Sequence, residues 1–193
     1  MPTLTIKTPQ VITLCFRQDK EDPDFGTCLW ADFNIDLEKY NLSIASDCGD
    51  FMYSGWTPTP ESECFLHLLS RIEGGYLLYK LTNKSCIDGV ETSRRFERYI
   101  SELEEDVPDE SKISKPDRDR LRRRCLNAMD DSDFYSEVMD ILEDYEDLSK
   151  LVESDYLYDC IVKDYTPNEK KISEIFTKYI APKCRELCKG AKT

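Results

Sequence analysis

The chain has 193 residues and a formal net charge of −13, with 40% hydrophobic residues. This hydrophobic content argues against global disorder, and the negative charge disfavours phosphate binding by the surface as a whole. No apolar run approaches the roughly 18 residues of a membrane span, and the N-terminus MPTLTIKTPQ has no signal-peptide pattern. We therefore expect a cytoplasmic protein with no membrane partner.

Four short segments rich in β-branched and aromatic residues occupy the first third of the chain. Residues 4–16, 27–36 and 42–45 are separated by turns, and residues 51–56 continue extended after a kink or turn at 46–50. Short strands with short connections predict an antiparallel meander.

Helical patterns follow these strands. Thr59 and Pro60 suit a helix start, and Gly74-Gly75 suits its end. Residues 76–81 and 92–105 are further apolar or amphipathic helical segments, and the two prolines in 107–116 predict a linker. The predicted fold class is therefore α+β, with an N-terminal antiparallel sheet and packed helices in 1–107. A helical region follows in 108–193, and the two regions can pack as one unit.

Caps and breaks organise the predicted helical region. Ser114 suits the N-cap of the first helix, and Thr166-Pro167 suits the start of a later one. A further helical segment covers 155–164, and Pro182 is expected to interrupt the last helix.

Asp130–Asp159 is the most distinctive stretch, with twelve acidic residues and one basic residue, Lys150. Its apolar residues recur at spacings of three and four, which predicts one helix with a face that packs on a core. Five carboxylates repeat the same spacing along a neighbouring edge: Asp133, Glu137, Asp140, Asp144 and Asp147. Like charges at this spacing cost a few tenths of a kcal/mol per pair, so local helix stability opposes the row.

Three interpretations of this carboxylate row remain open. It is a solvated face, a surface that imitates the phosphates of a nucleic acid and occupies a basic groove, or a cluster for hard metal ions. The calcium-loop pattern is absent, because no Gly follows the Asp cluster.

An arginine cluster precedes the acidic stretch. It consists of Arg118, Arg120, Arg122, Arg123 and Arg124. These residues spread around a helix, with Asp117 and Asp119 among them, so we favour pairing with the acidic runs 102–110 and 130–147. Contact with a nucleic acid is the alternative interpretation.

The sequence contains no catalytic motif that we recognise, so we expect no enzymatic activity. Its nine cysteines include no CxxC pair, which favours reduced thiols. Cys64 with His67 and Cys184 with Cys188 could together form a zinc site. Because their spacings match no zinc ribbon or finger, we expect neither a metal nor another cofactor.

Residues 40–81 run from LSIASDCGDFMYSGWTPTP to ECFLHLLSRIEGGYLLYKL and combine an S-D-x-G turn, an aromatic strand and an apolar helix. This pattern resembles small, mostly uncharacterised phage and prophage proteins. The resemblance implies an origin in a mobile element and no catalytic residues. Small acidic phage proteins include many inhibitors of host defence, such as anti-CRISPR proteins.

The leading functional hypothesis is therefore a non-enzymatic inhibitor that binds a basic host protein. The partner would be a CRISPR effector nuclease or its nucleic-acid complex, and Asp133, Glu137, Asp140, Asp144 and Asp147 would bind it. Two alternatives are a nucleic-acid-binding protein that uses Arg118–Arg124 and a structural or regulatory phage protein that forms a homodimer.

Overall fold

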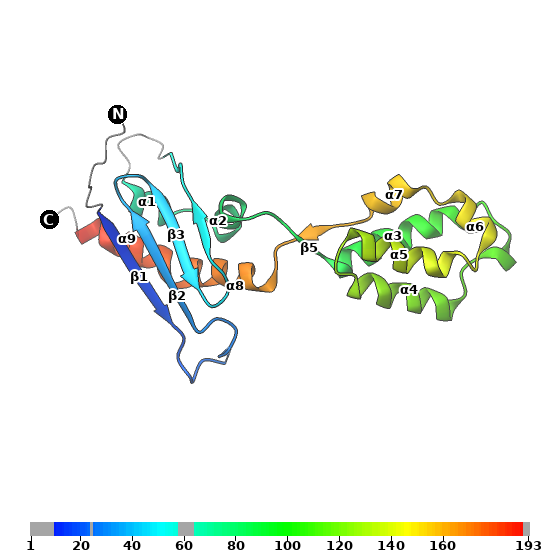
Figure 1. The fold of residues 1–193 in the computed structure, drawn as a ribbon, viewed down its shortest axis with the longest axis horizontal. Coiled ribbons are helices and arrows are strands. Elements are labelled where there is room, and N and C mark those ends of the chain that lie inside the picture. Colours follow the sequence, from blue (N-terminus) through cyan, green and yellow to red (C-terminus); the bar gives the residue numbers. More distant parts are fainter. Residues whose placement is uncertain (1–9, 24, 58–63, 191–193) are drawn as a thin grey trace, which may run out of the picture. The chain divides into compact units, whose positions relative to one another are not determined.

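The computed structural model describes residues 10–23, 25–57 and 64–190. Internal contacts divide the chain into two compact units. The sheet unit combines Met1–Asn83 with Tyr165–Thr193, and the helical unit is Lys84–Asp164. The helical unit is thus an insertion in the sequence of the sheet unit (Figure 1).

Four antiparallel strands form the sheet in the order β1-β2-β3-β4 (Figure 1). They are β1 (Val11–Arg17), β2 (Trp30–Asp36), β3 (Asn41–Ser46) and β4 (Phe51–Tyr53). Val11 pairs with Asp36, and Ala31 pairs with Ser46. The predicted meander and the α+β fold class are confirmed, while residues 4–9 of the first predicted strand lie outside the described residues.

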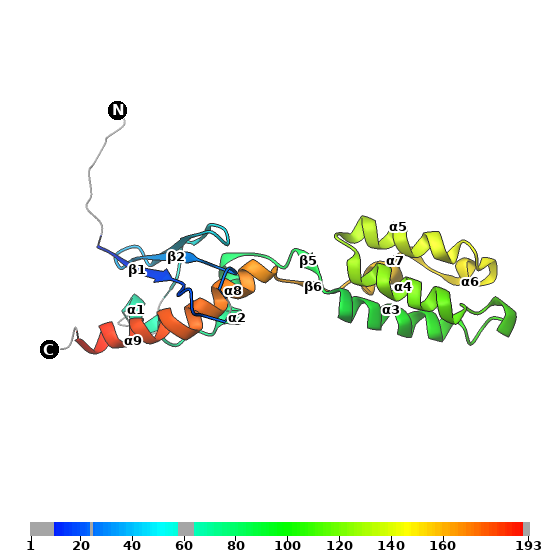
Figure 2. The ribbon, with the colours of Figure 1, turned by 90° about the horizontal axis from the view of Figure 1, so that it is seen from below.

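Alternating side chains place one face of the sheet in a core. Phe33 and Ile35 of β2 are fully buried, whereas Asp32 and Asn34 between them are partly exposed. Helices cover the apolar face as a second layer (Figure 2). In this core the ring centre of Phe176 lies 6.3 Å from that of Phe33. The helical elements of the sheet unit are α1 (Phe65–Leu69), α2 (Gly74–Leu81), α8 (Pro167–Ile175), the π-helical turn η2 (Phe176–Ile180) and α9 (Ala181–Gly190).

Helix boundaries in this unit differ from the predictions at two places. Gly74 begins α2 instead of ending the preceding helix, which already stops at Leu69. Pro182 does not interrupt the last helix, because the π-helical turn before it leads directly into α9. The predicted cap Thr166 is confirmed as part of a reciprocal capping box with Glu169, and the predicted cap Thr59 lies outside the described residues.

The chain enters and leaves the helical unit through the antiparallel pair β5 (Cys86–Ile87) and β6 (Lys163–Asp164). A separate core forms among its helices, with Phe96, Phe134 and Val138 almost completely buried. Its helical elements are α3 (Gly89–Leu103), η1 (Asp109–Ser111), α4 (Lys115–Asn127), α5 (Asp131–Leu142), α6 (Glu146–Leu151) and α7 (Ser154–Asp159).

The boundaries of the two units differ from the expected division into 1–107 and 108–193. The expected linker 107–116 lies inside the helical unit, where Ile113 is buried and its N–H donates to Glu104 Oε1 at 2.9 Å. Helices α8 and α9 belong to the sheet unit, since their apolar faces cover the strands. The apolar face of an amphipathic helix predicts that the helix packs against another element, but it does not identify that element.

A candidate protein-binding surface

Negative charge is concentrated in the helical unit. Residues 84–164 hold 24 Asp and Glu against 13 Lys and Arg, a net charge of −11. The sheet unit holds the other 15 acidic and 13 basic residues, a net charge of −2. The acidic character of this protein is therefore a property of one unit.

The acidic stretch does not form the single helix that its spacing predicts. Helix α5 ends at Leu142, the chain turns at residues 143–145, and α6 begins at Glu146. Tyr145 at this turn is held by α4, because its hydroxyl accepts from Ser114 N at 3.0 Å and donates to Asp117 Oδ2 at 2.8 Å. This tertiary contact breaks the continuous row of carboxylates.

The first three members of the row contact residues of their own unit. Arg124 of α4 lies 2.6 Å from Glu137 Oε2 and 2.8 Å from Asp140 Oδ2, and it joins α4 to α5. Asp133 Oδ2 accepts from Met129 N at 2.9 Å, just before α5. These carboxylates thus have structural partners.

Most members of the arginine cluster also form ion pairs within the helical unit. Arg118 pairs with the buried Glu104, Arg122 lies 3.7 Å from Glu97, and Arg120 lies 3.7 Å from Asp140. Within the described part of the chain, Arg123 alone among the five forms no ion pair, and its Nε donates to the Asp119 carbonyl. This arrangement agrees with the interpretation that the arginines balance acidic neighbours.

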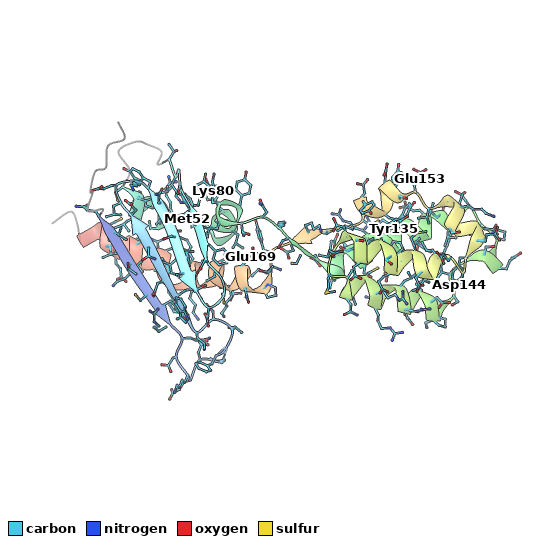
Figure 3. The ribbon with its side chains drawn as sticks, viewed as in Figure 1. Met52, Lys80, Tyr135, Asp144, Glu153 and Glu169 are labelled. Carbon is cyan, nitrogen blue, oxygen red and sulfur yellow. The ribbon has the colours of Figure 1, made fainter. Side chains whose placement is uncertain are left out.

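The last two members of the row, Asp144 and Asp147, are exposed. Figure 3 labels Asp144 at the end of the helical unit opposite β5, and Figure 1 labels α6, the helix that contains Asp147, at the same end. Here the Ser111 hydroxyl donates to Asp147 Oδ2 at 2.7 Å, which joins α6 to η1. Further carboxylates lie on the chain beside this contact. We call the exposed set the acidic end: Glu102, Glu105, Asp106, Glu110, Glu143, Asp144 and Asp147.

No residue of the acidic end forms an ion pair within the described structure. The local cations are already used, since Lys112 pairs with Asp109 and Lys150 with Glu146. The sequence analysis paired the acidic run 102–110 with the arginine cluster, so it missed the exposed carboxylates of this run. A usable signal was present, because segments 102–112 and 143–150 together contain ten acidic residues and only two lysines.

Aromatic side chains of α7 add exposed surface to the same unit. Tyr156 stacks on Tyr99 with ring centres 5.9 Å apart, and Tyr158 stacks on Tyr135 at 5.7 Å. Both α7 tyrosines remain about half exposed, whereas Leu157 between them is buried. Such rigid, partly exposed tyrosines are typical of strong protein contacts. Figure 3 labels Tyr135 together with Glu153, which precedes α7.

The zinc site considered from the sequence is only partly assembled. Cys64 Sγ and Cys188 Sγ are 3.6 Å apart, so α1 and α9 bring these two thiols together. Burial raises the pKa of Cys184 to about 12. The four side chains Cys64, His67, Cys184 and Cys188 do not converge to within 4.8 Å of one another.

Among the described residues, none of the helices has the length and apolar character needed to cross a membrane. Comparison with known proteins matches residues 6–186 to the model of a phage protein family. No curated protein and no solved structure matches the chain. Because the family match covers nearly the whole sequence, this chain belongs to that phage protein family.

Proposed function

We propose that this phage protein is a non-enzymatic inhibitor that binds a basic surface of a host nucleic-acid-handling defence complex. A CRISPR effector complex is the most concrete target. The acidic end of the helical unit provides the contact, in place of a nucleic-acid phosphate backbone. Asp144 and Asp147 of the original row remain part of this surface, whereas Asp133, Glu137 and Asp140 hold the unit together.

The concentration of net charge, −11 in the helical unit and −2 in the sheet unit, is the observation on which the proposal rests. The carboxylates of the acidic end have no cationic partners in the described structure, so their mutual repulsion opposes folding. A basic partner would remove this repulsion on binding. Complementary charge also raises association rates by about 10- to 1000-fold at low salt.

Exposed Tyr156 and Tyr158 supply the apolar component that charge alone lacks. Charged contacts at the rim of an interface contribute mainly to the association rate, whereas desolvated aromatic anchors contribute more to affinity. The arginine cluster is not assigned to nucleic-acid binding, because four of its five members form ion pairs.

A test replaces Glu105, Glu110, Glu143 and Asp144 together with Lys and measures phage or plasmid survival in bacteria with an active CRISPR system. We expect the wild-type protein to restore survival and the variant to lose this effect. A matched control makes the same change to Lys at four exposed acids of the sheet unit, Glu21, Glu38, Asp50 and Glu73. Circular dichroism of both variants checks that their folds are intact.

Equal activity of the two variants would exclude the acidic end as the contact surface. If the wild-type protein protects phage or plasmid against none of a panel of CRISPR and restriction systems, the inhibitor proposal is wrong.

A further inference from the structure

Two cysteines and an aspartate meet at one end of the β2–β3 pair, far from the helical unit in sequence. Cys28 precedes β2, and Asp47 and Cys48 directly follow β3. Because Ala31 pairs with Ser46, the antiparallel register brings these flanking residues side by side. The Asp47 N–H continues the pairing by donating to the Trp30 carbonyl at 3.4 Å.

The potential ligand atoms of Cys28, Asp47 and Cys48 all lie within 4.8 Å of one another. Cys28 Sγ is 3.4 Å from Asp47 Oδ1. In tetrahedral zinc sites, Zn–S bonds of about 2.3 Å and Zn–O bonds of about 2.1 Å separate sulfur from oxygen by about 3.6 Å. The observed Cys28–Asp47 separation is close to this value, so these two side chains need little movement to share one ion.

The surroundings of the cluster favour a cation. Cys28 is completely buried and Cys48 almost so, while Asp47 is exposed. The Asp47 carboxylate accepts hydrogen bonds from the N–H groups of Leu29 at 2.9 Å and Trp30 at 3.3 Å, which hold it beside the two thiols. Among the described residues, no Lys or Arg forms an ion pair with this carboxylate.

We propose that Cys28, Asp47 and Cys48 bind a zinc ion that stabilises the sheet unit. The Thr27 carbonyl oxygen, 3.1 Å from Cys48 Sγ, or a water molecule supplies the fourth ligand. Zinc binding releases the two thiol protons to solvent, so the affinity increases with pH. The bound ion links the connection between β1 and β2 to the turn after β3.

The other close thiol pair provides an internal comparison. The Sγ atoms of Cys64 and Cys188 are 3.6 Å apart, but Cys64 is exposed and the described residues complete no three-ligand group with this pair. Cys125 is a buried thiol of the helical unit. Variants of Cys64 and Cys125 therefore serve as matched controls for the loss of a thiol.

The test uses the full chain, reduced and freed of metal by chelation, and titrates it with Co²⁺. We expect thiolate-to-cobalt absorption that saturates at one ion per chain and is displaced by Zn²⁺. Zn²⁺ should also raise the melting temperature followed by tryptophan fluorescence, since both tryptophans lie in the sheet unit. Cys28→Ser should abolish the absorption, whereas Cys64→Ser and Cys125→Ser should retain it.

Asp47→Asn keeps both thiols, so it tests the metal site without removing a buried thiol from the core. We expect it to weaken cobalt binding by about tenfold or more while circular dichroism stays unchanged. The proposal is overturned if cobalt gives no thiolate absorption, or if Cys64→Ser abolishes the absorption and Cys28→Ser does not. A Cys28–Cys48 disulfide that persists in the reduced preparation, detected by mass spectrometry, would also overturn it.

Discussion

The sheet unit and the helical unit differ in net charge and in how far their charged residues are paired. The sheet unit is almost neutral and places its alternating strands against covering helices. The helical unit has its own core and a net charge of −11, part of which lies in carboxylates without cationic partners. Because each unit has its own apolar core, the fold tolerates excess charge in one of them. Three experiments test this difference between the two units.

The largest expected effect comes from separating the two cores. Phe134 is fully buried in the helical unit, so Phe134→Ala should destabilise that unit by about 3–5 kcal/mol. The part of the helical circular dichroism signal that comes from the helical unit should then melt earlier, whereas the part from the helices of the sheet unit should not. Tryptophan fluorescence, which reports only on the sheet unit, should melt at the wild-type temperature.

Phe33→Ala is the matched control, because Phe33 is equally buried in the core of the sheet unit. It should lower the fluorescence transition first. If each substitution shifts both signals equally, the two units unfold as one and the comparison fails.

An intermediate effect is expected at the arginine helix. Arg124→Ala removes the contacts with Glu137 and Asp140 that join α4 to α5, and should cost about 1 kcal/mol of unfolding free energy. Part of this loss should disappear in high salt, since exposed ion pairs are screened. Urea denaturation measures the free energy of unfolding of the Arg124→Ala and Arg123→Ala variants. A larger loss for Arg123→Ala, which removes no ion pair, would contradict the assignment.

The smallest effect concerns Asp117 and is expected to depend on pH. Hydrogen bonds from Ser114 and then from Tyr145 lower the pKa of the Asp117 carboxyl. A lowered folded-state pKa contributes stability above the unfolded pKa of about 3.9, and this contribution is lost as pH falls through the folded value. Asp117→Asn should therefore lower the melting temperature at pH 7 and have less effect near pH 2. An equal decrease in melting temperature at pH 7 and near pH 2 would show that the carboxylate charge does not contribute to stability.

Local sequence signals were sufficient for several elements. Alternation and β-rich composition predicted the antiparallel meander, because every second residue of a half-buried strand must be apolar. The kink or turn expected at residues 46–50 separates β3 from β4. Ser114 and Thr166 predicted helix starts correctly, since each side chain accepts from an N–H in its own first turn. The net charge of each unit also follows from composition once the boundaries are known.

Contacts between distant residues decided the rest. The stripe of α8 and η2 predicted a buried face, but only packing against Phe33 assigned it to the sheet. The spacing of acidic residues predicted one continuous row, but Tyr145 turns toward α4 and divides it. Cys28 and Cys48 are twenty positions apart, and only the β2–β3 register brings them together. Residue patterns and composition were enough to predict the elements and the amount of charge. Which carboxylates are neutralised and which thiols meet depends on long-range contacts, so these features follow only from the folded chain.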